Sequence, residues 1–255
     1  MITEYHRPKT LEEALILLSR PDTLPLGGGT LLSRESISAY SVVDLQALHL
    51  DKIQKIGDKL EIGATTTLSQ LLKSQYLPRA LAVALRQEAT LNLRNSGTVA
   101  GTVVTASGRS PFVTAMLALD ARLYFAPGDD LVSFGDYLPM RNLTNNDQPT
   151  SRGKLIVKVE IPLNADLAFE TVARTPADQP IVCAALAHWP SGRTRLALGG
   201  WGETPLLALD GTGTDDLEAS ARNAFADAGD PWASAAYRSE VAAVLANRCA
   251  HNMGL

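Results

Sequence analysis

Two segments of small residues, about seventy positions apart, constrain this chain more than any other feature of its sequence. The first runs from Leu26 through three consecutive glycines to Thr30, and the second runs from Ser96 to Thr102 with glycines at positions 97 and 101. Glycine permits positive φ and close approach of a ligand, and a backbone turned in this way directs several N–H groups into one concavity of anion size. Each segment therefore predicts a phosphate-binding loop, and the pair could hold the two phosphates of a pyrophosphate.

Either segment taken alone more often marks a tight turn between strands. Neither has the spacing of the G-x-G-x-x-G dinucleotide fingerprint or of a P-loop with its lysine. If the chain binds a nucleotide, the sequence predicts that it does so on another scaffold.

Composition and charge exclude several classes of protein. The length of 255 residues suits one large domain or two small ones. A net charge of −4 with scattered lysines and arginines argues against nucleic acid as a partner. No apolar run approaches the roughly 20 residues that span a bilayer, and the first residues lack the regions of a signal peptide, so we expect a cytoplasmic protein without membrane insertion.

Metal chemistry is also disfavoured. Cys183 and Cys249 are the two cysteines, and the four histidines are scattered along the sequence. An iron–sulfur cluster needs about four cysteine ligands, and a structural zinc site needs clustered Cys or His. We expect no metal site in this chain, and no histidine–carboxylate pair indicates a catalytic acid or base.

Hydrophobic periodicity and capping signals predict alternating helices and strands. The predicted helices cover residues 11–18, 68–72, 78–89, 111–119, 215–228 and 233–250, and the predicted strands cover 41–45, 60–63, 122–125, 155–161, 167–174, 181–188 and 194–200. Residues 126–153 are rich in Asp, Asn, Pro and Gly, which predicts irregular structure with a mobile loop at about 142–151. A domain boundary is expected near residue 162.

The order of the motifs resembles a known family. The resemblance rests on Tyr5 with Arg7-Pro8, Gly27 to Thr30, Val43-Asp44-Leu45, Ile62-Gly63-Ala64, Arg94-Asn95, Leu117 to Ala121, Leu198-Gly199-Gly200 and Tyr237-Arg238. In this order the chain resembles the FAD-binding (medium) subunit of molybdenum hydroxylases, the family of the carbon monoxide dehydrogenase medium chain and the xanthine dehydrogenase flavin domain.

The resemblance implies an α+β fold. It comprises a two-subdomain FAD-binding domain of the PCMH/VAO type at 1–161, with subdomains at about 1–55 and 56–161. A C-terminal domain of the CO dehydrogenase flavoprotein type follows at 162–255, with a three-stranded antiparallel sheet and helices.

The resemblance also implies a function. The chain would be the FAD-bearing subunit of a molybdopterin dehydrogenase, an oxidoreductase that is inactive on substrate by itself. It would pass electrons from iron–sulfur clusters on a small partner subunit to an acceptor, with a molybdenum-containing large subunit as the second partner. The implied cofactor-binding residues are Leu26, Gly27, Gly28, Gly29, Thr30 and Leu31 in the first loop and Thr98, Ala100, Gly101 and Thr102 in the second.

The chain departs from the family pattern at four positions. The family's second loop usually reads Thr-Ile-Gly-Gly-Asn, whereas this chain has Ala100 and Thr102 at its third and fifth positions. Leu31 stands where the family often has Asp or Asn, and Glu170 aligns with a lysine that some relatives place near the flavin. These changes leave open a second interpretation, a non-flavin scaffold or assembly subunit of the same fold. A third is a self-contained flavoenzyme on this scaffold, similar in fold to the reductase of cell-wall precursor synthesis.

Overall fold

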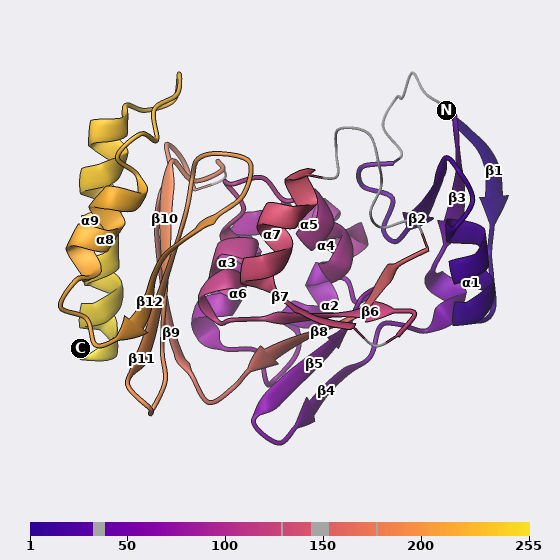
Figure 1. Ribbon diagram of the computed structural model, residues 1–255, viewed down its shortest axis with the longest axis horizontal. Helices are drawn as coiled ribbons and strands as arrows, with labels where there is room; N and C mark the ends of the chain where they lie inside the picture. Colours follow the sequence, from indigo (N-terminus) through magenta and orange to yellow (C-terminus); the bar gives the residue numbers. More distant parts are fainter. Residues whose placement is uncertain (33–38, 129, 144–152, 177) are drawn as a thin grey trace.

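The computed structural model describes residues 1–32, 39–128, 130–143, 153–176 and 178–255. Three sheets follow one another along the molecule, and helices separate the second sheet from the third (Figure 1). The N-terminal sheet and the two C-terminal helices lie at opposite ends of this arrangement.

The N-terminal sheet is parallel and has the order β1-β3-β2. Its strands are β1 (Ile2–His6), β2 (Thr23–Leu26) and β3 (Tyr40–Asp44), with α1 (Leu11–Leu18) between β1 and β2 and the 3₁₀ helix η1 (Gln46–Leu48) after β3. Thr10 caps α1 by accepting a hydrogen bond from the backbone N–H of Glu13. The apolar face of α1 then packs on Val43 of β3 and Leu155 of the second sheet, which joins the first sheet to the rest of the molecule.

The second sheet is antiparallel and carries helices on one face (Figure 1). Its order is β4 (Ile53–Ile56), β5 (Lys59–Gly63), β8 (Leu155–Pro162), β6 (Arg122–Ala126) and β7 (Asp130–Ser133). The helices are α2 (Leu68–Leu72), α3 (Arg79–Glu88), α4 (Leu91–Ser96), α5 (Val99–Thr105), α6 (Pro111–Ala118) and α7 (Phe134–Leu143).

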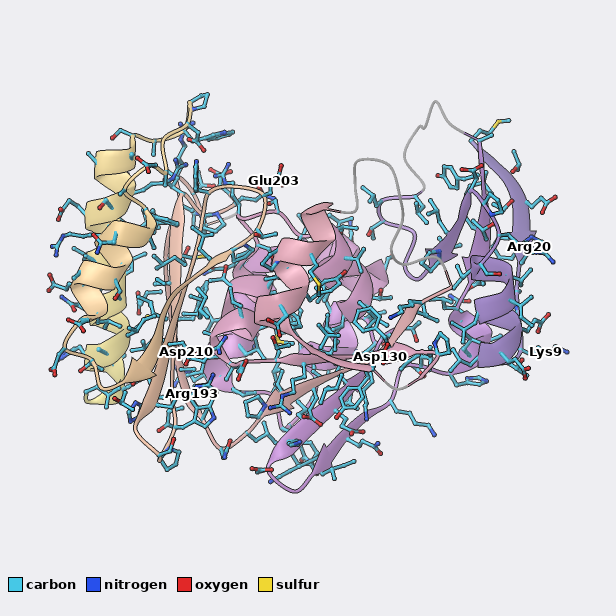
Figure 2. All side chains as sticks on the ribbon, viewed as in Figure 1. Lys9, Arg20, Asp130, Arg193, Glu203 and Asp210 are labelled. Atoms are coloured by element: carbon cyan, nitrogen blue, oxygen red, sulfur yellow. The ribbon has the colours of Figure 1, made fainter. Side chains whose placement is uncertain are left out.

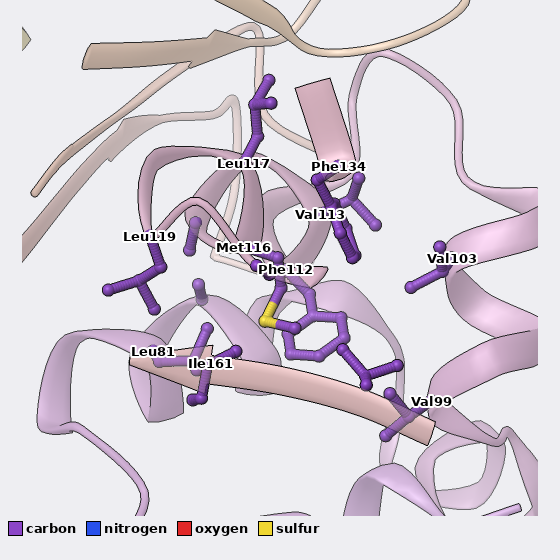
Figure 3. Close-up of a cluster of buried hydrophobic side chains, with 14 of the residues drawn as sticks. Leu81, Val99, Val103, Phe112, Val113, Met116, Leu117, Leu119, Phe134 and Ile161 are labelled. Atoms are coloured by element: carbon purple, nitrogen blue, oxygen red, sulfur yellow. The ribbon is translucent and has the colours of Figure 1, made fainter. Parts of the chain in front are cut away.

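Helix α6 forms the centre of the main core. All of its residues are buried, as expected for a helix that is apolar on every side. Figure 3 shows Phe112 and Met116 of α6 at the centre of the cluster, with Ile161 of β8 on one side and Val99 and Val103 of α5 on another. This packing fixes α5, and with it the second glycine segment.

The third sheet is antiparallel, with the order β12-β11-β10-β9, and lies between two layers of helices (Figure 1). Its elements are β9 (Asp166–Val172), β10 (Val182–His188), β11 (Arg193–Gly199), β12 (Leu206–Thr212), α8 (Leu217–Ala224) and α9 (Ala235–Met253). Alternate residues of β10 enter different cores: Cys183 and Ala185 face α6, whereas Ala184 and Leu186 face α8 and α9. Burial on both faces explains why the sequence of β10 is apolar without alternation.

Several expectations need correction. The C-terminal sheet has a fourth strand, β12, beyond the three expected. The segment 126–153, expected to be irregular, contains β7 and α7, while most of the expected mobile loop at 142–151 lies outside the described residues. The expected domain and subdomain boundaries stay predictions; the one at about residue 55 lies within β4 of the second sheet.

Candidate functional site

The first glycine segment begins where a parallel strand ends. Leu26 is the last residue of β2 and is in register with Asp44 of β3, and the N–H of Leu45 donates to the carbonyl oxygen of Leu26 at 3.1 Å. Gly29 has φ of +68°, a conformation that favours glycine. The turn thus lies at the carboxyl end of the sheet, the usual place for ligands in parallel sheets.

Asp44 fixes the sheet beside this turn. Its side chain is buried, its Oδ1 accepts from the N–H of Gln46 at 2.9 Å, and its Oδ2 accepts from the hydroxyl of Tyr5 and lies 3.6 Å from Nε of Arg7. The hydrogen bond to Asp44 is the main reason that the pKa of the Tyr5 phenol is raised. Tyr5, Arg7 and Asp44, which the sequence indicated only through the resemblance, therefore tie β1 to the end of β3, the strand beside the start of the first segment.

The second glycine segment is the start of helix α5 and not an open loop. Thr98 is the N-cap, and its Oγ1 accepts from the N–H of Gly101 at 3.2 Å. The N–H groups of Val99 and Ala100 donate to the carbonyl oxygens of Thr66 and Ala64, at 2.9 and 3.1 Å. The N–H and the hydroxyl of Thr102 both donate to the carbonyl oxygen of Thr98, each at 2.9 Å. The first four N–H groups of α5 are thus committed to acceptors within the protein.

The helical backbone at position 100 accommodates alanine in place of the family's glycine. Ala100 lies inside α5, and positive φ is confined to other residues among the described ones. Alanine is a favourable helix residue, so the family's glycine is not needed here for backbone conformation.

The structure brings the two glycine segments into direct contact. A Cβ on Gly27 would lie 2.8 Å from Oγ1 of Thr98, and a Cβ on Gly28 would lie 1.7 Å from the carbonyl oxygen of Ser96. Side chains at these two positions would push the segments apart. The glycines therefore allow a turn from the N-terminal sheet to lie against the N-terminus of α5.

The remaining hydrogen-bond donors at this junction suit an anion. Within the described part of the chain, the N–H groups of Gly27, Gly28 and Thr30 take part in no hydrogen bond, and the hydroxyl of Thr98 donates to no acceptor. These donors fit the phosphates of a dinucleotide, and most of them come from the first segment.

Two residues considered from the sequence are hydrogen-bonded to other parts of the chain. Glu170 of β9 is on the same face of the sheet as Ala168, and its Oε1 accepts from Nδ2 of Asn252 in α9 at 2.8 Å. Glu170 therefore faces α9 and not α6, and its alignment with a residue near the flavin stays a prediction. Nη1 of Arg94 donates to the carbonyl oxygens of Arg86 and Ala89, both at 2.7 Å, and so ties α4 to the end of α3.

One half-buried carboxylate, Glu88, binds the start of α6 and was not identified from the sequence. Oε2 of Glu88, at the end of α3, accepts from the hydroxyl of Ser110 at 2.7 Å and from the N–H of Phe112 at 3.0 Å. Burial raises the pKa of Glu88, and these two hydrogen bonds oppose the rise. Ser110 and Pro111 predicted the start of α6, but no local signal connected them to a carboxylate on α3.

The described residues contain no group of three or more His, Cys, Asp or Glu side chains placed to hold a metal ion. Among the same residues, no helix is long and apolar enough to cross a membrane.

Comparison with known proteins identifies the family. A family model described as the FAD binding domain in molybdopterin dehydrogenase matches residues 1–164, which is more than half of the chain. The chain belongs to this family. It is 27% identical over 276 residues to the carbon monoxide dehydrogenase medium chain of Afipia carboxidovorans, covering 96% of this chain and 94% of that one. It is also 28% identical over 253 residues to the uncharacterized protein YgfM of Escherichia coli K12, with the same coverage.

The fold agrees with this membership. The structure matches a chain of reconstituted CO dehydrogenase from Oligotropha carboxidovorans with a TM-score of 0.80 and 25% identity, over 98% of both chains. The resemblance seen in the sequence is thereby confirmed, and with it the α+β fold, FAD as the cofactor and the oxidoreductase class. The individual FAD contacts in the two segments stay predictions.

Proposed function

We propose that this chain is the electron-transfer subunit of a molybdenum-containing hydroxylase complex, and that it holds the FAD pyrophosphate mainly on the turn from Gly27 to Thr30. The observation that carries the proposal is the contact between the two glycine segments. It places the N–H groups of Gly27 and Gly28, which bind no acceptor among the described residues, beside the N-cap of α5. When bound, FAD would supply redox chemistry that accepts two electrons and releases them singly or together.

The two cysteines of this chain support the inference that partner subunits carry the iron–sulfur clusters. Both cysteines are buried, and burial raises the pKa of each thiol to about 12, so they are protonated near pH 7 and poor ligands for iron. An iron–sulfur relay would therefore be on another chain. The medium chain of carbon monoxide dehydrogenase, by its name, is one chain of several. We infer a small iron–sulfur subunit and a large molybdenum subunit as partners, in the cytoplasm.

The residues at the junction would bind and orient the cofactor. The backbone N–H groups of the first segment and the Thr98 hydroxyl would donate to phosphate oxygens, and Asp44 with Tyr5 and Arg7 would hold the turn in place. Leu31 has 47% of its surface exposed next to this turn and can offer only apolar contact.

An absorption spectrum tests the proposal. Purified protein is incubated with excess FAD and desalted, and the flavin that remains is measured. Retention of about one FAD per chain supports the proposal. A folded protein that takes up no FAD, alone or co-expressed with iron–sulfur and molybdenum subunits, would contradict it.

One observation favours the second candidate, a scaffold subunit without flavin. The N–H groups at the start of α5 are all committed within the protein, so the second segment offers an anion little beyond the Thr98 hydroxyl. Stoichiometric FAD that survives desalting would exclude this candidate.

A further inference from the structure

Three side chains from distant segments meet on the surface beside the third sheet. They are Arg109 from the connection between α5 and α6, Arg174 just after β9, and Trp232 from the connection between α8 and α9. The guanidinium carbons of Arg109 and Arg174 lie 4.6 and 4.8 Å from the centroid of the Trp232 ring, and Trp232 has 51% of its surface exposed. Both distances lie in the range of cation–π attraction.

The framework around the cluster is rigid. Nε and Nη2 of Arg109 donate to the carbonyl oxygens of Pro180 and Gln179, at 3.0 and 3.1 Å. The N–H of Trp232 donates to Oδ1 of Asp230 at 2.8 Å, and both oxygens of Asp230 accept from Nη2 of the fully buried Arg238 at 2.9 Å. The Arg109 guanidinium and the backbone of Trp232 are therefore held in position before any partner binds, which lowers the entropic cost of association.

Asp230 and Asp178 act electrostatically on Arg109, but neither carboxylate forms an ion pair with Arg109 or Arg174 in the described chain. Arg174 makes no hydrogen bond or ion pair with any described residue, and Nη1 of Arg109 likewise has no acceptor there. The carboxylate of Asp230 is already committed to Arg238, and that of Asp178 forms no ion pair within the described chain. Two arginines thus face outward on a protein whose net charge is −4.

We propose that the surface formed by Arg109, Arg174 and Trp232 docks a carboxylate-bearing segment of a partner protein. Planar guanidinium groups bind carboxylates through paired hydrogen bonds, and Trp and Arg are the residues most enriched at the energetic centres of protein interfaces. The exposed ring provides the apolar contact, and the two arginines provide the charge complementarity. The proposal goes beyond FAD binding, because none of the three residues belongs to either glycine segment.

The test uses the full chain and a hexaglutamate peptide as the probe, with hexaglutamine as the uncharged control. Tryptophan fluorescence is followed at low salt during each titration. The expected result is a saturable change with hexaglutamate and none with hexaglutamine. Arg174→Ala should weaken binding about fivefold, whereas Arg248→Ala, an exposed arginine on α9, should leave it unchanged.

Two results would overturn the proposal. One is a hexaglutamate titration that gives no change, or the same curve in the wild type and Arg174→Ala. The other is a response to inorganic pyrophosphate without any response to the peptide, which would assign the cluster to small anions. Since Arg174 is exposed, its variant is expected to fold, and a thermal melt checks this. FAD content, measured on the same samples, reports separately on the flavin site.

Discussion

Replacing Gly28 with alanine should separate the two glycine segments. The new Cβ would lie 1.7 Å from the carbonyl oxygen and 2.5 Å from the carbonyl carbon of Ser96. Carbon–oxygen contacts are ordinarily about 3.3 Å or longer, so one backbone must move by roughly 1.5 Å. Overpacking of this kind costs about 1–3 kcal/mol, and we expect the upper end because both neighbours are backbone. For a chain of this size, a loss of about 3 kcal/mol lowers Tm by roughly 6–12 °C.

Two measurements read out the effect. A thermal melt gives the loss of stability, and calorimetric titration with FAD gives the affinity of the displaced turn. If the shift removes about 1.4 kcal/mol or more of phosphate binding, Kd rises about tenfold or more. Gly211→Ala is the neutral control, because a Cβ there meets nothing within 4 Å. Gly57→Ala is a second control. Gly57 has φ of +60°, and a Cβ there also meets nothing within 4 Å, so this variant measures the cost of backbone strain without a steric collision.

The contact between the segments would be refuted by a Gly28→Ala protein that melts within about 1 °C of the wild type. Unchanged FAD affinity despite a lower Tm would show that the contact stabilises the fold but does not position the binding turn. A loss in Gly211→Ala as large as that in Gly28→Ala would attribute the effect to general glycine sensitivity.

Three further predictions concern the supporting structure. Arg238→Met removes a fully buried guanidinium that binds Asp230 and three carbonyl oxygens, and it should cost about 3–5 kcal/mol in urea denaturation; a loss below about 1 kcal/mol would contradict the packing described. Thr98→Val removes the cap of α5 and should cost about 0.5–2 kcal/mol, whereas Thr98→Ser should restore the stability. The hydrogen bond from Arg193 is the main cause that lowers the pKa of Asp210, and Figure 2 shows these side chains close together. A lowered pKa in the folded state stabilises the protein above the unfolded value of about 3.9, and this contribution is lost as the pH falls through the folded pKa. Asp210→Asn should therefore destabilise at pH 7 and approach the wild type as the pH falls below the unfolded value of about 3.9, and a deficit that does not shrink below that pH would be inconsistent with the ion pair.

Local signals in the sequence predicted helix starts well. The capping signals predicted helices that begin at residues 68 and 111, and the structure shows Thr67 and Ser110 as the N-caps of α2 and α6. A capping side chain bonds to a backbone N–H two or three residues away, so the information is contained in a short window. Predictions of this kind do not depend on how the rest of the chain folds.

Helix α5 was missed because its stability is not local. Its sequence has glycine and several β-branched residues, which are weak helix formers. The helix forms where the N–H groups of Val99 and Ala100 bond to the residues after β5, and where Val103 is buried in the main core. Those contacts join parts of the chain more than thirty positions apart, which a window of sequence cannot show.

The sequence predicted which residues form the candidate site, namely the two glycine segments, but not how these segments lie relative to each other. The spacing of the two glycine segments does not say whether they touch, because their contact depends on how α1 and β3 pack on the second sheet. The side on which Glu170 lies is set by strand register, and a shift of one residue would reverse it. Glu88 was missed for the same kind of reason, since it reaches α6 from another helix.

The most direct test of the central claim compares calorimetric titrations of the wild-type protein with FAD and with riboflavin, which has the same ring system but no phosphate. If the turn from Gly27 to Thr30 holds the pyrophosphate, FAD should bind saturably at one per chain, and riboflavin should bind at least about 100-fold more weakly, the equivalent of about 2.8 kcal/mol. Equal affinity for the two ligands would contradict the account, because it would show that the glycine turn contributes nothing to binding.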